Sequence, residues 1–199
     1  MLNKGATTKV IKRLFTKPTK ETPDSLLERV CIIGDKVVFT DGYIAVVTKP
    51  EQLLVDSELY IDYKDIDNKS VKNAYKTISE IDTTHLESMV LVNRNRLTEN
   101  FKEAKNHKYF ADNPYRFRER PVLTQIGNCN RRYDTSLLID SAKMFKAKNV
   151  YFAMTKDGNF AVVTDWKRTA YAIIAPSCAY PFEETDKIPC VKIEDILTF

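Results

Sequence analysis

Short apolar runs separated by turn dipeptides are the feature that most constrains how this chain folds. Three such runs lie near the start, separated by Gly34-Asp35 and Asp41-Gly42: Leu26–Ile33, Lys36–Thr40 and Tyr43–Thr48. Three more follow late in the chain, the first two separated by Asp157-Gly158: Val150–Thr155, Asn159–Thr164 and Thr169–Ala175. Turn dipeptides between runs rich in β-branched residues are typical of antiparallel hairpins. The sequence therefore predicts two antiparallel meanders.

Four other segments carry apolar residues at helical spacing. They are Thr8–Phe15, Asp65–Ile78, Arg96–His107, for which Asn95 is the predicted N-cap, and Leu137–Ala147. Further strands are predicted at Glu58–Tyr63, Glu87–Val92 and Pro121–Ile126. Because helices and strands do not alternate regularly, the predicted fold class is α+β, with mainly antiparallel sheets and short helices. No apolar run approaches the roughly 20 residues that span a bilayer, so no membrane contact is expected.

Two stretches of the sequence echo each other. Residues 40–48 read TDGYIAVVT and residues 156–164 read KDGNFAVVT. Hairpins of this kind recur by chance in antiparallel proteins, but a duplicated unit is the alternative. On the second interpretation, the 199 residues form two similar halves, 1–93 and 94–199. Each half is too small to bury a large core, so we expect the halves to join their sheets edge to edge.

The net charge of +4 hides an uneven distribution along the chain. Residues 1–20 carry six basic residues and no acidic ones, and residues 94–148 carry thirteen basic and six acidic. The segment between them has seven basic and fourteen acidic residues, and residues 149–199 have five and seven. Chance clustering on a solvated surface is one interpretation. The other is a protein with one basic face that attracts a polyanion.

Much of the positive charge lies on the predicted helices. The candidate phosphate contacts there are Lys9, Lys12, Arg13, Lys69, Lys72, Lys76, Lys102, Lys105, Lys143 and Lys146. If they bind one polyanion, the helices should share one face of the molecule. Lysine is also a good helix former that is common on solvated surfaces, so the alternative is that these lysines are ordinary surface residues with no ligand.

The segment Tyr109–Arg120 interleaves aromatic residues with arginines, and its candidate DNA contacts are Arg116 and Arg118. This composition suits single-stranded nucleic acid, where bases stack on aromatic rings and phosphates pair with cations. It also suits a protein interface. A plain strand with arginines on one side is the third interpretation.

No enzyme is predicted. The chain has no P-loop, dinucleotide-binding or nucleophile-elbow motif. A magnesium-dependent nuclease would need the nearby carboxylates to converge, namely Asp56, Glu58, Asp62, Asp65 and Asp67. The four cysteines form no C-x-x-C pair, so neither a metal nor another cofactor is expected.

Two smaller expectations concern single residues. We expect Cys31 to be a buried apolar residue and the single tryptophan, Trp166, to pack against its hairpin. No secretory leader is apparent, which favours a cytoplasmic protein with reduced thiols.

Three stretches resemble DNA sliding clamps. They are VCIIGDKVVFTDGYIAVVT at 30–48, ELYIDYKDIDNKSVKNAYKTI at 58–78, and the segment 135–176, which ends in Ile173-Ile174-Ala175-Pro176. Residues 79–135 match poorly. Bacterial clamp subunits have three domains of this kind, whereas this chain has room for two, the plan of trimeric clamps. A reduced, phage-encoded form would fit that difference.

The resemblance implies a non-enzymatic protein that encircles duplex DNA as a homo-oligomer and keeps a polymerase or another replication protein on it. Ile193–Phe199 is similar to the peptide by which polymerases dock on clamps, although it lacks the leading Gln, and a terminal strand is the simpler interpretation. The alternative function is a phage-type interaction module that inhibits a nucleic-acid-processing enzyme.

Overall fold

A computed structural model shows how these segments are arranged. It describes residues 2, 3, 5, 7, 29–40, 42–53, 60–106, 122–127, 131–177 and 190–193. The predicted helix at 8–15 and the segment 109–120 lie outside the described residues. No described helix combines the length and the apolar character needed to span a membrane.

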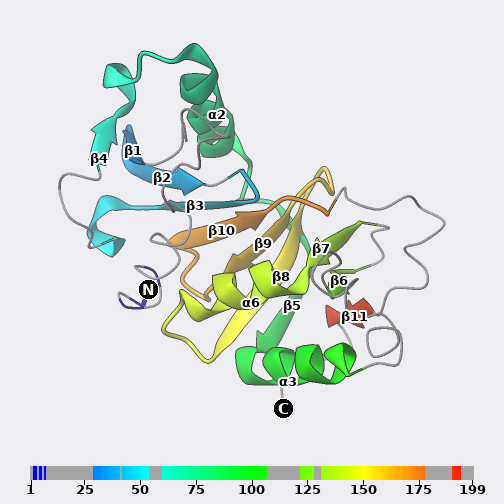
Figure 1. Ribbon diagram of the computed structural model, residues 1–199. Coiled ribbons are helices and arrows are strands. Elements are labelled where there is room, and N and C mark those ends of the chain that lie inside the picture. The colour runs from blue at the N-terminus through cyan, green and yellow to red at the C-terminus, as the bar shows by residue number, and fades with distance from the viewer. Residues whose placement is uncertain are drawn as a thin grey trace.

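The two predicted meanders form and join edge to edge (Figure 1). The first consists of β1 (Val30–Ile33), β2 (Lys36–Thr40) and β3 (Ile44–Thr48), and the second of β8 (Asn149–Thr155), β9 (Ala161–Thr164) and β10 (Ala170–Ile174). Their join is the antiparallel pair β3–β10, in which Val46 lies opposite Ala172. This confirms the expectation that the two meanders join edge to edge in one sheet.

Two outer strands complete a sheet of eight strands. β4 (Tyr60–Asp62) runs parallel to β1, and β5 (Leu86–Asn93) runs antiparallel to β8, so the order is β4-β1-β2-β3-β10-β9-β8-β5. A smaller sheet holds β11 (Cys190–Lys192), β6 (Leu123–Gln125) and β7 (Arg132–Asp134), with β11 parallel to β6. The α+β class with mainly antiparallel sheets is therefore confirmed.

The three described helices are α2 (Lys69–Glu80), α3 (Arg94–Lys105) and α6 (Thr135–Lys143). The prediction that a helix starts at Asp65 was wrong, because Tyr63–Asp65 form a 3₁₀ turn, η3, and α2 begins after it at Lys69. Another 3₁₀ turn, η1 (Pro50–Gln52), follows β3. Asn68 then caps α2 by accepting from the N–H groups of Ser70 and Val71. The helix predicted at Leu137–Ala147 has different bounds in the structure, since α6 starts at Thr135 and ends at Lys143.

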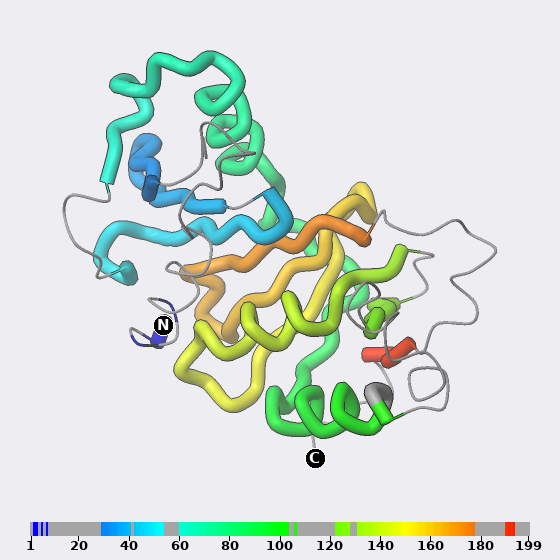
Figure 2. The backbone as a smooth tube through the Cα atoms, viewed as in Figure 1, coloured from blue at the N-terminus to red at the C-terminus, as the bar shows by residue number. Residues whose placement is uncertain are grey.

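The eight-stranded sheet is covered on both faces. Because side chains alternate along a strand, Val37 and Phe39 point to one face and Val38 to the other. The first face packs against Leu97 of α3 and against Leu138 and Ala142 of α6. The second face packs against Val71 and Tyr75 of α2. Figures 1 and 2 show α6 crossing in front of β8 and β9.

This arrangement corrects one expectation. The lysine-bearing helices were expected to share one face, but α2 lies across the sheet from α3 and α6. The physical reason is that both faces of β2, β3 and β10 are apolar, so each face needs its own cover.

The sequence echo does not coincide with the symmetry of the sheet. The repeated stretch ends in β3 in its first copy and in β9 in its second. In the sheet, however, β3 corresponds to β10, because each is the last strand of its meander and the two pair at the centre. A division of the chain at Asn93 also leaves β5 in the first half although it pairs with β8.

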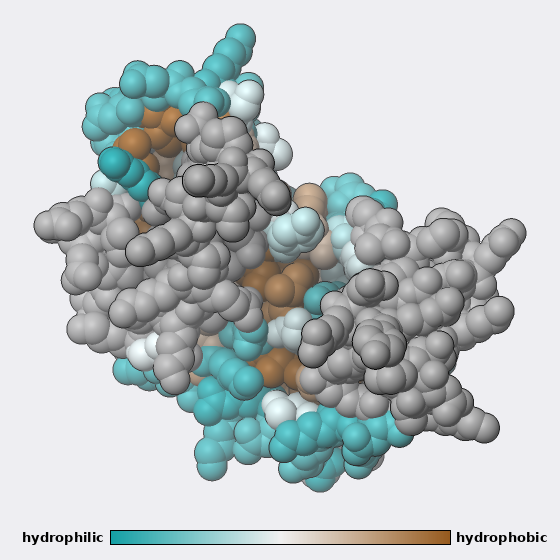
Figure 3. Space-filling model, viewed as in Figure 1, coloured by the Kyte–Doolittle hydropathy of each residue, from teal (hydrophilic) through white to brown (hydrophobic). Residues whose placement is uncertain are grey.

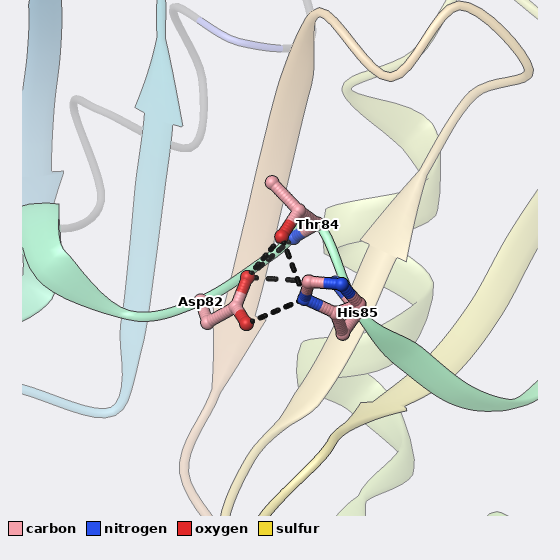
Figure 4. Close-up of polar contacts among 3 residues, drawn as sticks. All are labelled: Asp82, Thr84 and His85. Atoms are coloured by element: carbon pink, nitrogen blue, oxygen red, sulfur yellow. Dashed lines mark hydrogen bonds and ion pairs between the residues drawn. The ribbon is translucent and has the colours of Figure 1, made fainter.

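A short linker connects α2 to β5 and is held by a cluster around one carboxylate (Figure 4). Asp82 Oδ1 accepts from the backbone N–H and the hydroxyl of Thr84, at 2.8 and 2.5 Å, and Asp82 Oδ2 lies 3.0 Å from Nδ1 of His85. These hydrogen bonds hold the pKa of Asp82 well below its usual range.

Candidate nucleic-acid interface

The α3–α6 pair forms where β5 and β7 end. The side chain of Asn93 accepts from the N–H of Asn95 at 3.0 Å, so Asn93, rather than the predicted Asn95, caps α3. The guanidinium of Arg94 then donates to the carbonyl of Phe145 at 3.0 Å. That bond ties the start of α3 to the chain just after α6, and the two helices contact each other.

The N-terminus of α6 is fixed by Asp134, the last residue of β7. Its Oδ1 accepts from the backbone N–H of Ser136 at 2.7 Å and from the Ser136 hydroxyl at 2.6 Å. Leu138 and Ala142 are fully buried against the sheet. On the other side of the helix Ser136 and Asp140 are half-buried, and Lys143 at its end is exposed.

Three of the predicted contact residues lie exposed on this pair. Lys102 is on α3, Lys143 ends α6 and Lys146 follows it. Lys143 Nζ lies 4.0 Å from Asp140 Oδ1, with about half of the lysine side chain exposed. Such an exposed ion pair stabilises little, so the ammonium group remains able to bind a phosphate. Figure 3 shows a hydrophilic surface over α3.

The pair as a whole is basic. Its described charged residues are Arg94, Arg96, Lys102, Lys143, Lys146 and Lys148 against Glu99, Glu103 and Asp140. Alternating signs of charge along α3 reduce the local field, whereas Lys143, Lys146 and Lys148 lie close together in the sequence. The most positive part of this surface is therefore the end of α6.

The lysines of α2 lie on the other face of the molecule, and two of them have protein partners. Lys72 Nζ donates to the carbonyl of Lys64 at 3.3 Å and lies 5.1 Å above the ring of Tyr63. Lys76 Nζ lies 3.8 Å from Glu80 Oε1. The structure thus separates Lys69, Lys72 and Lys76 from the α3–α6 surface.

The remaining predicted contacts fall outside the described residues. These are Lys9, Lys12, Arg13, Arg116 and Arg118, together with the side chain of Lys105 on α3. The carboxylate cluster that a nuclease would need is not found among the described residues, and Asp56 and Glu58 lie outside them. Asp62 accepts from the N–H of Lys64 at 2.9 Å, and no cluster of metal-ligating residues occurs in the described ranges.

Two exposed aromatic residues were not predicted as surface features. Trp166 is 72% exposed, so the expectation that it packs on its hairpin was wrong. It lies in the β9–β10 turn, and Lys167 Nζ lies 5.3 Å from the centroid of its ring. Tyr43, which is 70% exposed, follows Gly42 in the β2–β3 turn.

Tyr43 borders an apolar groove of about 320 Å³ next to the β3–β10 join. Its lining comes from the start of β3, from β10 and from one side of α2, with Ile44, Ile78, Ile81, Phe160 and Ile173 as the large apolar residues. The sequence signal for this groove was the turn Asp41-Gly42-Tyr43, which places an aromatic residue where a turn residue is usually polar.

Comparisons with known proteins give one consistent result. No family model and no curated protein sequence matches the chain. Among solved structures, the DNA polymerase III beta subunit from Eubacterium rectale matches 89% of this chain at a TM-score of 0.52 and 10% identity. DNA polymerase III subunit beta from Borrelia burgdorferi, solved in complex with a natural product, matches 90% at a TM-score of 0.51 and 14% identity.

The chain has a sliding-clamp-like fold. The match covers nearly the whole chain but spans only 64% of the length of each of the two clamp structures. At these identities the likeness concerns the fold, and it confirms the resemblance seen in residues 30–48, 58–78 and 135–176. Among the described helices, α3 and α6 contact each other, and each carries an exposed lysine, Lys102 and Lys143.

Proposed function

We propose that the protein is a non-enzymatic, clamp-like DNA-binding protein that acts as a replication processivity factor in the cytoplasm. The observation that carries the proposal is a sliding-clamp-like fold whose adjacent helices α3 and α6 expose Lys102 and Lys143, with Lys146 exposed just after α6. Lysine ammonium groups bind phosphates without reading bases, as a protein that moves along DNA requires. The α3–α6 surface is thus the proposed DNA-facing side.

Salt dependence tests this proposal. Each phosphate neutralised by a lysine contributes about −0.9 to the slope of log affinity against log salt concentration. Replacing Lys102, Lys143 and Lys146 by Gln should therefore make the slope shallower by about 0.9 for each phosphate that is no longer neutralised. Affinity for a duplex of arbitrary sequence, measured by fluorescence anisotropy over a range of salt concentrations, gives the slope.

The chain offers a matched control on the other face. Lys69→Gln with Lys76→Gln removes two exposed charges from α2 and should leave the slope unchanged. A slope that depends on the α2 lysines and not on Lys102, Lys143 and Lys146 would place the DNA on the α2 face. Salt-independent binding, or none, would contradict the proposal as a whole.

The proposal includes assembly into a ring or an arc from two clamp-like halves, residues 1–93 and 94–199. The outer strands of the large sheet, β4 and β5, have an unpaired edge within the described residues. Open strand edges pair readily with another copy. Light scattering should give a closed dimer, trimer or tetramer, and the assembly should stay on circular DNA in high salt but slide off linear DNA. A strictly monomeric protein contradicts encirclement.

The proposed partner is a replication protein, such as a polymerase, that inserts an apolar segment into the groove beside Tyr43. The groove supports this because its large lining residues are apolar and it is open at the join of the two meanders. Ile78→Lys should abolish the complex with the replicative polymerase and leave DNA affinity intact. A stable complex with a host enzyme that needs no DNA would instead favour the inhibitor function.

A further inference from the structure

A second hollow, of about 340 Å³, lies at the other end of the β3–β10 join. Lys36 and Asp35 come to it from the start of β2, Lys49 from the end of β3, and Arg168 and Tyr171 from the β9–β10 turn and β10. The end of α2 and the linker after it close one side. Neither the α3–α6 surface nor the apolar groove includes Lys49 or Arg168.

The lining of this hollow is strongly positive. It contains three cationic side chains, Lys36, Lys49 and Arg168, against the single carboxylate of Asp35. In the described part of the chain, no carboxylate lies within ion-pair distance of the three cations. Lys36 Nζ donates to the carbonyl of Ser79 at 2.8 Å, and Arg168 Nη2 lies 3.4 Å from the sulfur of Met89. Both contacts position the cations without neutralising them.

A hydroxyl group without a partner among the described residues lies beside these cations. The Oγ1 of Thr169 is buried and makes no hydrogen bond there, whereas the neighbouring Thr48 hydroxyl donates to the Thr169 carbonyl at 3.4 Å. A buried hydroxyl left without a partner costs free energy that an incoming acceptor would recover.

Arg168 is held in an unusual conformation. Its φ is 50°, in the left-handed region that residues other than glycine seldom adopt. The turn is fixed by Asp165, whose carbonyl accepts from the Arg168 N–H at 3.0 Å and whose Oδ1 accepts from the Lys167 N–H at 3.2 Å. Strained residues of this kind gather at ligand sites, because the surrounding structure must hold them in place.

We propose that this hollow binds the phosphate monoester group of a small ligand, either free phosphate or a nucleoside monophosphate. A phosphate carries close to two negative charges at neutral pH and several strong acceptor oxygens, which match the cationic side chains of Lys49 and Arg168. The apolar lining contributed by Val47, Ile81 and the Tyr171 ring suits a base or sugar. A DNA phosphodiester has only one charge and sits within a bulky duplex, so it fits the hollow less well.

Isothermal titration calorimetry tests the proposal with inorganic phosphate, a nucleoside monophosphate and the matching nucleoside. One molecule of each phosphate ligand should bind per chain, and the nucleoside should not bind. Lys49→Gln and Arg168→Gln should each weaken binding about tenfold or more, because each removes a charge-assisted hydrogen bond. Binding should also strengthen as pH rises through about 6, where the phosphate gains its second charge.

Lys167→Gln is the matched control, because it removes a positive charge next to Arg168 from a side chain that does not line the hollow. It should leave the affinity unchanged. Tighter binding of the nucleotide than of phosphate would identify the nucleotide as the ligand, and equal binding would identify free phosphate. The proposal is overturned if neither phosphate ligand binds, or if Lys49→Gln, checked for folding by circular dichroism, binds as well as the unaltered protein.

Discussion

At the scale of single residues, Cys31 illustrates how burial sets reactivity. It is fully buried in β1 among the residues that α2 covers, as the sequence predicted. Burial, with a smaller contribution from the carboxylate of Asp62, raises the pKa of the Cys31 thiol to about 11. At pH 8 only about one thiol in a thousand is then the reactive thiolate.

Cys31 should therefore resist alkylation by iodoacetamide in the folded protein and react once denaturant is added. Cys190, which is half-buried in β11, is the internal comparison and should react sooner. Peptide mass spectrometry after timed labelling distinguishes the two sites. Equal labelling rates for the two thiols in the folded state would show that the first meander opens readily.

The lowered pKa of Asp82 makes the stability of the protein depend on pH. Because the carboxylate accepts from Thr84 and His85 in the folded state, its pKa lies below the unfolded value of about 3.8. A lowered carboxyl pKa contributes stability above the unfolded pKa, and that contribution is lost as pH falls through the folded pKa. Asp82→Asn should therefore lower the melting temperature at pH 7, and lower it progressively less as pH falls below the unfolded pKa.

The comparison for this variant is Asp67→Asn, which changes an exposed carboxylate just before α2. It should leave the melting temperature unchanged across this pH range. If Asp82→Asn melts like the unaltered protein at pH 7, the cluster in Figure 4 does not stabilise the linker.

At the scale of elements, the start of α6 depends on one side chain. Asp134 accepts two hydrogen bonds from Ser136, and removing such a cap costs about 1 kcal/mol. Asp134→Ala should lower the free energy of unfolding, measured by urea denaturation, by about that amount. Lys143→Ala, on the same helix, loses an ion pair made by a side chain that is about half exposed, and it should change the free energy of unfolding by less than about 0.5 kcal/mol.

The elements also show what the sequence could predict. The meanders were predictable because Gly34, Gly42 and Gly158 adopt positive φ in their turns, which the turn dipeptides announce. The three-residue strand β7 was missed because a run of that length has no measurable period. It forms because Tyr133 is buried and pairs with Thr124 across the smaller sheet, which is a tertiary contact.

The candidate site was predictable only in part, for the same reason. Helical spacing identified lysines on α2, α3 and α6, but spacing does not tell which face of a sheet a helix covers. That choice depends on β2, β3 and β10 being apolar on both faces, so that Val38 and Val47 need α2 while Phe39 and Val46 need α6. The positive hollow at Lys49 and Arg168 joins residues 119 positions apart, and no local pattern reveals it.

At the scale of the whole molecule, the larger core joins both meanders into one folding unit. Phe39 and Val46 from the first meander and Phe152 and Val163 from the second belong to the same buried cluster. Neither meander covers this apolar face by itself. The cover comes from α3 and α6, which lie between the two meanders in the sequence and pack against a cluster that contains residues of both. Small units that share one core unfold together.

Phe152→Ala should therefore destabilise the first meander as strongly as the second. Truncating a fully buried phenylalanine lowers the free energy of unfolding by about 3–5 kcal/mol. Every amide that exchanges through global unfolding should then exchange faster. Hydrogen exchange followed by mass spectrometry should show faster exchange in β2 and in β9 by the same factor. Lys156→Gln, in the exposed β8–β9 turn, should alter neither strand. Faster exchange confined to β8–β10 would mean that the halves unfold independently, and a ring built from this chain would then open at the β3–β10 join.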